Sequence, residues 1–191
     1  MLEKNNALKE KLISMLIEYS FKMDKNEIFP LASGKKSKYY VDCKATTMRA
    51  AALPIVGELL CSYIQEEVNA IGGLTMGADP LSMAASFYSA TINRNINSFS
   101  VRKEPKKHGM KKWIEGCVKS GDRVIVVDDV VTTGGSTITA IKHCEDEGLK
   151  VAGVVVLVDR EEENGFANIK NIVPNVPVQS IVTITDILNA Q

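Results

Sequence analysis

The chain has little cysteine and histidine, and this scarcity argues against several classes of protein. Its 191 residues include four cysteines, none of them in a Cys-x-x-Cys pair, and two histidines. A zinc site would need such ligands in clusters, and a disulfide-stabilised domain would need paired cysteines at regular spacing. The sequence predicts neither, and isolated cysteines favour a reducing compartment.

The chain also lacks net charge and long apolar segments. Lys and Arg number 23, as do Asp and Glu, so nothing attracts the chain generally to nucleic acid or anionic membranes. No segment reaches membrane-spanning length, and the opening MLEKNNALKEKL has no signal-peptide core. We therefore expect a cytoplasmic protein without nucleic-acid or membrane partners. With 45% apolar residues, the length suits one domain over residues 1–191.

Two valine-rich segments carry the clearest secondary-structure signal. Residues 123–129 and 151–159 are apolar without alternation, which is typical of buried parallel strands. Other patterns predict strands at 39–41, 70–76, 98–101 and 178–184, helices at 5–21, 51–68, 80–91 and 136–147, and a last helix capped by Thr185. Strands that alternate with helices predict an α/β fold, a mostly parallel sheet flanked by helices. Ligands of such sheets bind at the carboxyl ends of the strands.

The segment VIVVDDVVTTGGST, residues 124–137, combines an apolar strand with features of a binding site. The strand is expected to end in Asp128 and Asp129, and small or hydroxyl-bearing residues follow. Such residues let backbone N–H groups converge at the amino end of the next helix, which makes a phosphate cradle. The acids suit a ligand with vicinal hydroxyls or a divalent cation, as in a ribose 5-phosphate. The plainer alternative is a glycine-rich turn that starts a helix.

The segment RKEPKKHGMKK, residues 102–112, concentrates positive charge. It holds six of the 23 Lys and Arg residues, and Pro105 and Gly109 predict a mobile loop. The usual meaning of such a run is a solvated basic loop. The functional alternative is a lid whose lysines close over a polyanion such as pyrophosphate and exclude water.

Both segments resemble parts of a known enzyme family. The strand, acids and loop strongly resemble the phosphoribosyl pyrophosphate (PRPP) motif of type I phosphoribosyltransferases. The basic segment matches the more specific catalytic loop of orotate phosphoribosyltransferases at Arg102, Lys103, Lys106 and His108. The resemblance implies catalytic roles for Lys103, Lys106, His108, Asp128 and Asp129. It implies PRPP contacts from the basic four, from Gly77, Ala78 and Asp79, and from Asp128, Asp129, Val130, Val131, Thr132, Thr133, Gly134, Gly135, Ser136 and Thr137.

Two further segments resemble the family's base-binding parts. FPLASGKKSKYYVD, residues 29–42, matches its SGxxSxY pattern, and VDR at 158–160 matches the strand end whose arginine meets the carboxylate of orotate. The orotate contacts implied are Ser33, Gly34, Lys35, Tyr39, Thr133 and Arg160. The alternative for Arg160 is a surface ion pair with Asp159 or with one of Glu161, Glu162 and Glu163.

The chain departs from the family at two positions where many members carry lysine. Ala32 precedes the SG pair, and the pyrophosphate loop reads GADP at 77–80, without a lysine. Backbone N–H groups at Gly77, Ala78 and Asp79 can still meet a phosphate. The neighbouring lysines Lys35, Lys36 and Lys38 are the sequence's candidates for the missing charge.

The resemblance implies a magnesium-dependent orotate phosphoribosyltransferase that makes orotidine 5′-monophosphate and pyrophosphate. Asp128 and Asp129 would hold the metal, directly or through ribose hydroxyls and water. It also implies a homodimer that shares the basic loop between subunits, and a small hood formed by residues 1–45 and 160–191. Two alternatives are a phosphoribosyltransferase for another base and a nucleic-acid-binding regulator. The basic loop with Arg160 disfavours the first, and zero net charge disfavours the second.

Overall fold

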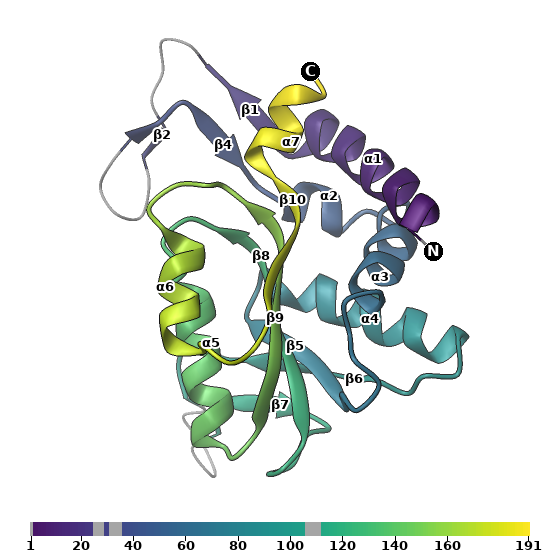
Figure 1. The fold of residues 1–191 in the computed structure, drawn as a ribbon, viewed down its shortest axis with the longest axis vertical. Coiled ribbons are helices and arrows are strands. Elements are labelled where there is room, and N and C mark those ends of the chain that lie inside the picture. Colours follow the sequence, from purple (N-terminus) through teal and green to yellow (C-terminus); the bar gives the residue numbers. More distant parts are fainter. Residues whose placement is uncertain (1, 25–28, 31–35, 106–111) are drawn as a thin grey trace.

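The centre of the molecule is a six-stranded sheet. The computed structural model describes residues 2–24, 29–30, 36–105 and 112–191. The strands lie in the order β10-β9-β8-β5-β6-β7, and every neighbouring pair is parallel except β6 and β7 (Figure 1). Their bounds are β5 Ala70–Leu74, β6 Asn97–Val101, β7 Ile114–Gly116, β8 Arg123–Val131, β9 Lys150–Asp159 and β10 Val178–Thr183. The predicted mostly parallel sheet is confirmed.

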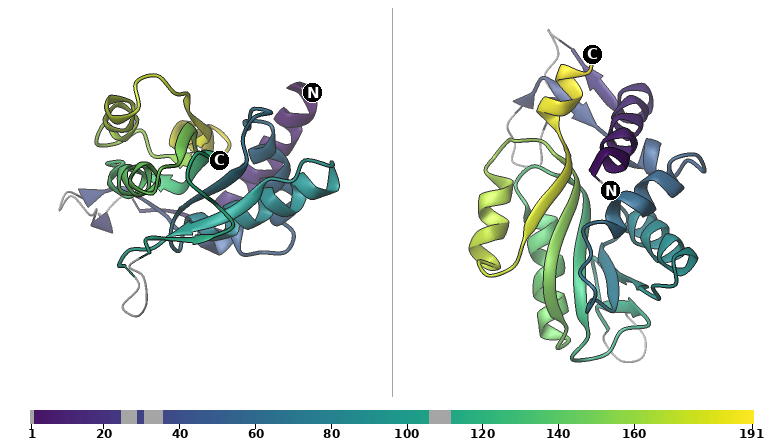
Figure 2. Two further views of the ribbon diagram at one scale, coloured as in Figure 1. Left: turned by 90° about the horizontal axis from the view of Figure 1, so that it is seen from below. Right: turned by 45° about the vertical axis from the view of Figure 1, so that its right-hand side comes forward.

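Helices cover both faces of this sheet, as the alternation of elements predicted. One face packs against α1 (Leu2–Tyr19), α3 (Leu53–Cys61) and α4 (Ala78–Thr91). The opposite face packs against α5 (Gly135–Asp146) and α6 (Gly165–Ile172), and the view from below separates the two layers (Figure 2). Residues 124–127 of β8 are wholly buried between these layers, which explains their apolar run without alternation.

Small elements lie beyond the carboxyl ends of the strands, at the top of Figure 1. Strand β1 (Phe21–Met23) pairs with β4 (Tyr39–Val41), and β2 (Phe29–Pro30) pairs with β3 (Lys36–Ser37). Helix α2 (Lys44–Thr47) follows β4, and α7 (Ile184–Asn189) packs against α1. The division into one domain with a hood at 1–45 and 160–191 stays a prediction. Among the described residues, no helix has the length and apolarity to cross a membrane.

Several details of the predicted elements were wrong. The helix predicted at 51–68 ends at Cys61. The prediction was too long because Ile64 and Val68, which are buried beyond the helix, continue its apolar pattern in the sequence. The last helix is capped by Thr183 and not by Thr185, because Thr183 and Asp186 form a reciprocal capping box. Helix α6 was not predicted, although Ile169 anchors it in the core.

Candidate active site

The two adjacent acids lie within strand β8, so the prediction that the strand ends in them was wrong. The strand continues to Val131, and Asp128 and Asp129 are only 5% and 7% exposed. Consecutive strand residues point to opposite faces, so the two carboxylates have different neighbours although both line one cavity. The Thr137 hydroxyl of α5 donates to Asp128 Oδ2 at 2.6 Å. Asp129 lies on the other side of the strand, against Gly77. A Cβ atom added to Gly77 would stand 2.3 Å from Asp129 Oδ1, so a larger residue at this position would require the Asp129 carboxylate to shift.

Burial changes the proton affinity of both acids. Desolvation raises the pKa of Asp128 to about 7, although the hydrogen bond from Thr137 opposes this, and the neighbouring charge of Asp129 adds to it. Desolvation also raises the pKa of Asp129, and the ammonium of Lys44 opposes that rise. Two buried acids with raised pKa values near the carboxyl end of a strand mark this position as a candidate functional site.

The loop after β8 has the geometry of an anion cradle. It turns through Gly134, whose φ of +80° is left-handed, and α5 begins at Gly135. The positive end of the α5 dipole therefore lies at this rim. Helix α6 supports the loop, since Asn168 Nδ2 donates to the Thr133 carbonyl at 3.0 Å. A Cβ at Gly134 would stand 2.9 Å from the Gly165 carbonyl oxygen, so the turn has no room for a larger residue.

A cavity of about 330 Å³ joins these acids to three distant parts of the chain. Its lining residues are Lys44, Leu74, Thr75, Met76, Gly77, Lys103, Asp128, Asp129 and Ser136. The structure thus brings Gly77, Lys103, both acids and Ser136 together, all of which the sequence singled out. Lys44 was not foreseen, since it follows a short strand and belongs to no motif. The Asp79 side chain accepts from the Ser100 hydroxyl at 2.7 Å, and the contact predicted for the Asp79 backbone N–H stays a prediction.

Arg160 lies at the end of β9 and reaches into the small elements above the sheet. It is 7% exposed, and its Nη2 donates to the Tyr39 carbonyl at 2.9 Å. The same nitrogen lies 2.8 Å from Glu162 Oε2, and Glu162 Oε1 accepts from the Ser37 hydroxyl at 2.7 Å. The pairing with Glu162 was the alternative left open by the sequence; in the structure the Arg160 side chain is 8% exposed and the Glu162 side chain 27% exposed. Arg160 Nε is buried without a hydrogen-bond partner in the described structure.

The remaining predicted residues divide into two groups. Ser33, Gly34, Lys35, Lys106 and His108 lie outside the described residues, as does the centre of the predicted basic loop. The described base of that loop is anchored, because the Arg102 N–H donates to the Trp113 carbonyl at 2.8 Å. Arg102 Nη1 also lies 3.4 Å from Glu115 Oε1, while Lys103 lines the cavity.

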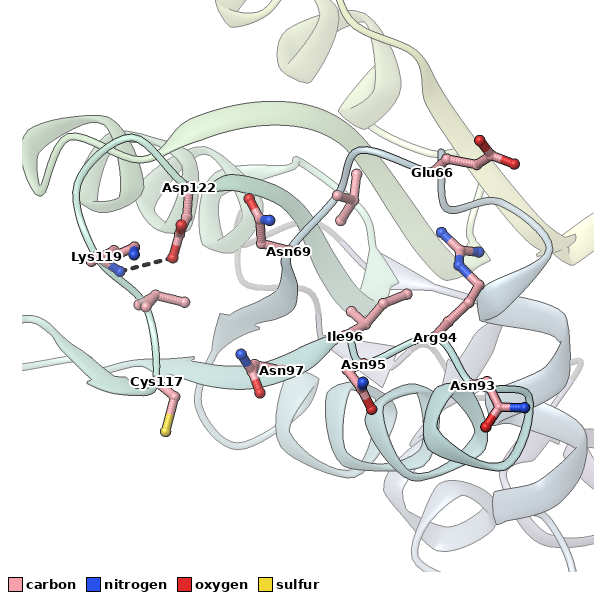
Figure 3. A pocket seen from close by; sticks show the side chains of 12 residues that line it. Glu66, Asn69, Asn93, Arg94, Asn95, Ile96, Asn97, Cys117, Lys119 and Asp122 are labelled. Atoms are coloured by element: carbon pink, nitrogen blue, oxygen red, sulfur yellow. Dashed lines mark hydrogen bonds between the residues drawn. The ribbon is translucent and has the colours of Figure 1, made fainter.

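A larger cavity, of about 660 Å³, lies at the opposite edge of the sheet. Figure 3 shows its side chains, which include Asn69 before β5, Asn97 at the start of β6 and Asp122 before β8. These positions are amino ends of parallel strands, whereas ligands of such sheets bind at the carboxyl ends. No residue singled out from the sequence lines this cavity.

Buried acids on a parallel strand, followed by a small-residue loop into a helix, are the arrangement that the resemblance to phosphoribosyltransferases implied. Residues 106–183 match the family model described as "Phosphoribosyl transferase domain". The orotate phosphoribosyltransferase of Aquifex aeolicus is 42% identical over 181 residues, which cover 94% of this chain and 97% of that relative. The chain therefore belongs to the orotate phosphoribosyltransferase family.

Solved structures agree with this assignment. The orotate phosphoribosyltransferase of Mycobacterium tuberculosis H37Rv, in complex with Fe(III) dicitrate, aligns with a TM-score of 0.77 and 32% identity. That alignment covers 94% of this chain and 98% of the other. The same enzyme in complex with PRPP aligns with a TM-score of 0.74 and 27% identity, over 95% of this chain and 92% of the other. The predicted family, fold class and enzyme class are confirmed.

Proposed function

We propose that this chain transfers the phosphoribosyl group from PRPP to orotate, in pyrimidine biosynthesis, at the cavity beside β8. The observation that carries the proposal is the meeting of Asp128, Asp129, Lys103 and Ser136 around one cavity of about 330 Å³. A relative of the same fold was solved with PRPP bound, which supports PRPP as the donor. A cytoplasmic location remains part of the proposal.

The sugar phosphate fits the part of the site formed by β8 and α5. The loop 132–137 and the amino end of α5 offer N–H groups and hydroxyls to the 5-phosphate. Asp129, on the side of the strand that faces Gly77, accepts hydrogen bonds from the ribose hydroxyls. Asp128 accepts a hydrogen bond from the Thr137 hydroxyl and also faces the cavity. In the proposal, Asp128 therefore orients the adjacent loop as well.

The reaction exchanges one bond at the anomeric carbon for another. The C–O bond to pyrophosphate breaks and its electron pair leaves with the pyrophosphate. The ring nitrogen of orotate loses its proton, which passes to the departing pyrophosphate or to water, and forms the C–N bond. Positive charge develops on the ribose and negative charge on the leaving group. The buried carboxylates stabilise the first, and Lys103, with Arg102, Lys106 and His108 of the basic loop, stabilises the second.

Arg160 is the proposed partner of the orotate carboxylate. Guanidinium groups bind carboxylates through paired, charge-assisted hydrogen bonds, and Arg160 already holds the carboxylate of Glu162 at 2.8 Å. Its unpaired Nε gives it capacity for one more acceptor. The other proposed orotate contacts are Tyr39, Thr133 and, from the base-binding segment, Ser33, Gly34 and Lys35.

Magnesium is the proposed cofactor. The carboxylates at this site fit an ion that binds together with the phosphates of the substrate. In the described part of the chain, no cluster of three or more His, Cys, Asp or Glu side chains could hold a metal ion. Mg²⁺ is commonly held by one or two carboxylates together with substrate phosphates, and Asp128 and Asp129 supply the carboxylates. Bound there, Mg²⁺ would neutralise charge on the pyrophosphate.

A homodimer is the proposed assembly, with the basic loop shared between subunits. An apolar groove of about 750 Å³ runs between α3 and α4, and Met83 and Phe87 at its edge are 60% and 76% exposed. Exposed apolar side chains of this size, grouped on one face, are typical of protein interfaces. Sedimentation of wild type and Phe87→Glu tests this: the wild type should sediment as a dimer and the variant as a monomer.

The proposed function is tested by pyrophosphate release with a panel of bases. Wild-type enzyme, PRPP and Mg²⁺ should release pyrophosphate with orotate, and much more slowly with uracil, adenine or hypoxanthine. Equal release with uracil and orotate would contradict the role of the carboxylate. If pyrophosphate is released only with a purine, the substrate is a purine base and not orotate, and the proposed PRPP site still stands.

A further inference from the structure

We infer that Lys44 is a PRPP-binding residue, which supplies from α2 the cationic contact to pyrophosphate that the loop 74–80 does not carry. This inference rests on the proposed PRPP site. The sequence LTMGADP at 74–80 contains no Lys or Arg, and residue 32 is alanine. A pyrophosphate group beside Asp129 would therefore meet a carboxylate, and a cation from elsewhere in the chain would add to the Mg²⁺ and Lys103 proposed there.

Lys44 lies where such a cation is needed. It lines the same cavity as residues 74–77 and both acids of β8. Its Nζ lies 3.9 Å from Asp129 Oδ2, and this is the only ion pair of Asp129 within the described ranges. Lys36 and Lys38, which the sequence offered for this charge, are exposed and do not line the cavity.

The backbone around Lys44 is held firmly, which gives its side chain a defined origin. Cys43, Thr46 and Thr47 are buried. The Thr46 hydroxyl lies 2.6 Å from the Ser20 hydroxyl, and it donates to the Met15 carbonyl at 3.2 Å. Helix α2 is therefore fixed against the end of α1, and Lys44 projects from its first residue toward the cavity.

The partners of Lys44 leave it able to bind an anion. Its Nζ lies 2.6 Å from Asp42 Oδ1, which holds the ammonium close to the backbone. An ammonium has three donors, and the 3.9 Å separation from Asp129 is longer than a hydrogen bond. A phosphate oxygen can therefore accept from Lys44 without displacing Asp42.

The test compares Lys44→Met with Lys44→Arg and with the control Lys119→Met. Lys119 is exposed and lines the cavity at the opposite edge of the sheet. Calorimetric titrations with inorganic pyrophosphate and with ribose 5-phosphate, each with Mg²⁺, measure binding of the two parts of PRPP separately. Lys44→Met should weaken pyrophosphate binding and raise the KM for PRPP at least tenfold. Binding of ribose 5-phosphate and the KM for orotate should change less than twofold. Lys44→Arg should restore part of the loss, and the control should behave as wild type.

Two results would overturn the inference. If Lys44→Met weakens binding of pyrophosphate and of ribose 5-phosphate equally, with an earlier thermal transition, Lys44 only supports the fold. Unchanged pyrophosphate binding would show that Lys44 makes no contact. These titrations contain no orotate, so they still test Lys44 if the base proves different. If the wild type binds neither probe, the proposed PRPP site itself is wrong.

Discussion

The two edges of the sheet each carry a cavity, and they differ in a way that identifies the active site. The cavity at the amino edge is larger, about 660 Å³ against about 330 Å³ at the carboxyl edge. Its side chains are mostly exposed amides and charges, which water can solvate. At the carboxyl edge two carboxylates are almost wholly buried, at 5% and 7% exposure. Burying a charged group costs free energy unless a ligand or a protein partner compensates for the lost hydration. The buried carboxylates therefore indicate the active site better than the size of a cavity does.

The largest expected difference between the edges is catalytic. Asp129→Asn should lower kcat/KM on the order of a hundredfold or more, because it removes a carboxylate from the developing positive charge. Asp122→Asn is the matched control at the amino edge, where the Asp122 side chain accepts from the Lys119 N–H at 3.0 Å. It should keep wild-type kinetics. Equal losses in the two variants, measured by pyrophosphate release, would remove the distinction between the edges.

The second expected effect separates the two substrates within the carboxyl edge. Arg160→Ala should lower kcat/KM for orotate at least tenfold, which needs only about 1.4 kcal/mol of lost interaction. The KM for PRPP should barely change, because Arg160 contacts the Tyr39 and Glu162 side of the site and does not line the 330 Å³ cavity. Steady-state kinetics with each substrate varied in turn measures both. If both substrates weaken together, Arg160 has a structural role instead.

A smaller effect follows from the pairing of Arg160 with Glu162. The Glu162 carboxylate occupies Arg160 at 2.8 Å, so it competes with the proposed orotate carboxylate. Glu162→Gln keeps the shape and a hydrogen-bond acceptor for Ser37 but removes the charge. The KM for orotate should fall about two- to fivefold, a range that corresponds to part of one charged contact. An increased KM for orotate would mean that Glu162 helps to place Arg160.

The smallest expected effect concerns stability and pH. The folded pKa of Asp128, about 7, lies above its ordinary value of 3.8, so the folded chain binds more protons than the unfolded chain between these values. Stability is therefore lost as pH rises from about 4 to 7, and the full loss persists above pH 7. Asp128→Asn should raise Tm by several degrees more at pH 8 than at pH 5. Calorimetry without ligand measures this, and an equal change at both pH values would contradict the burial of a charge.

The local parts of the site could be predicted from the sequence. Strand β8, its acids and the loop into α5 are contiguous, so composition and a family motif identify them together. The contacts between distant segments could not be predicted. Lys44 reaches Asp129 only because β4 and α2 fold over the sheet, and Glu162 reaches Ser37 across 125 positions of sequence. Apolar periodicity also misplaced the end of α3, because Ile64 and Val68 are buried although they lie beyond the helix.

Hydrogen exchange with and without PRPP and Mg²⁺ tests most directly which edge of the sheet is the active site. Bound PRPP should slow exchange at amides 75–79 and 132–137, which surround the carboxyl-edge cavity and its loop. Amides 93–97 and 117–122, around the amino-edge cavity, should exchange as before. Protection confined to the second pair of segments would place the PRPP site at the wrong end of the sheet and contradict the account.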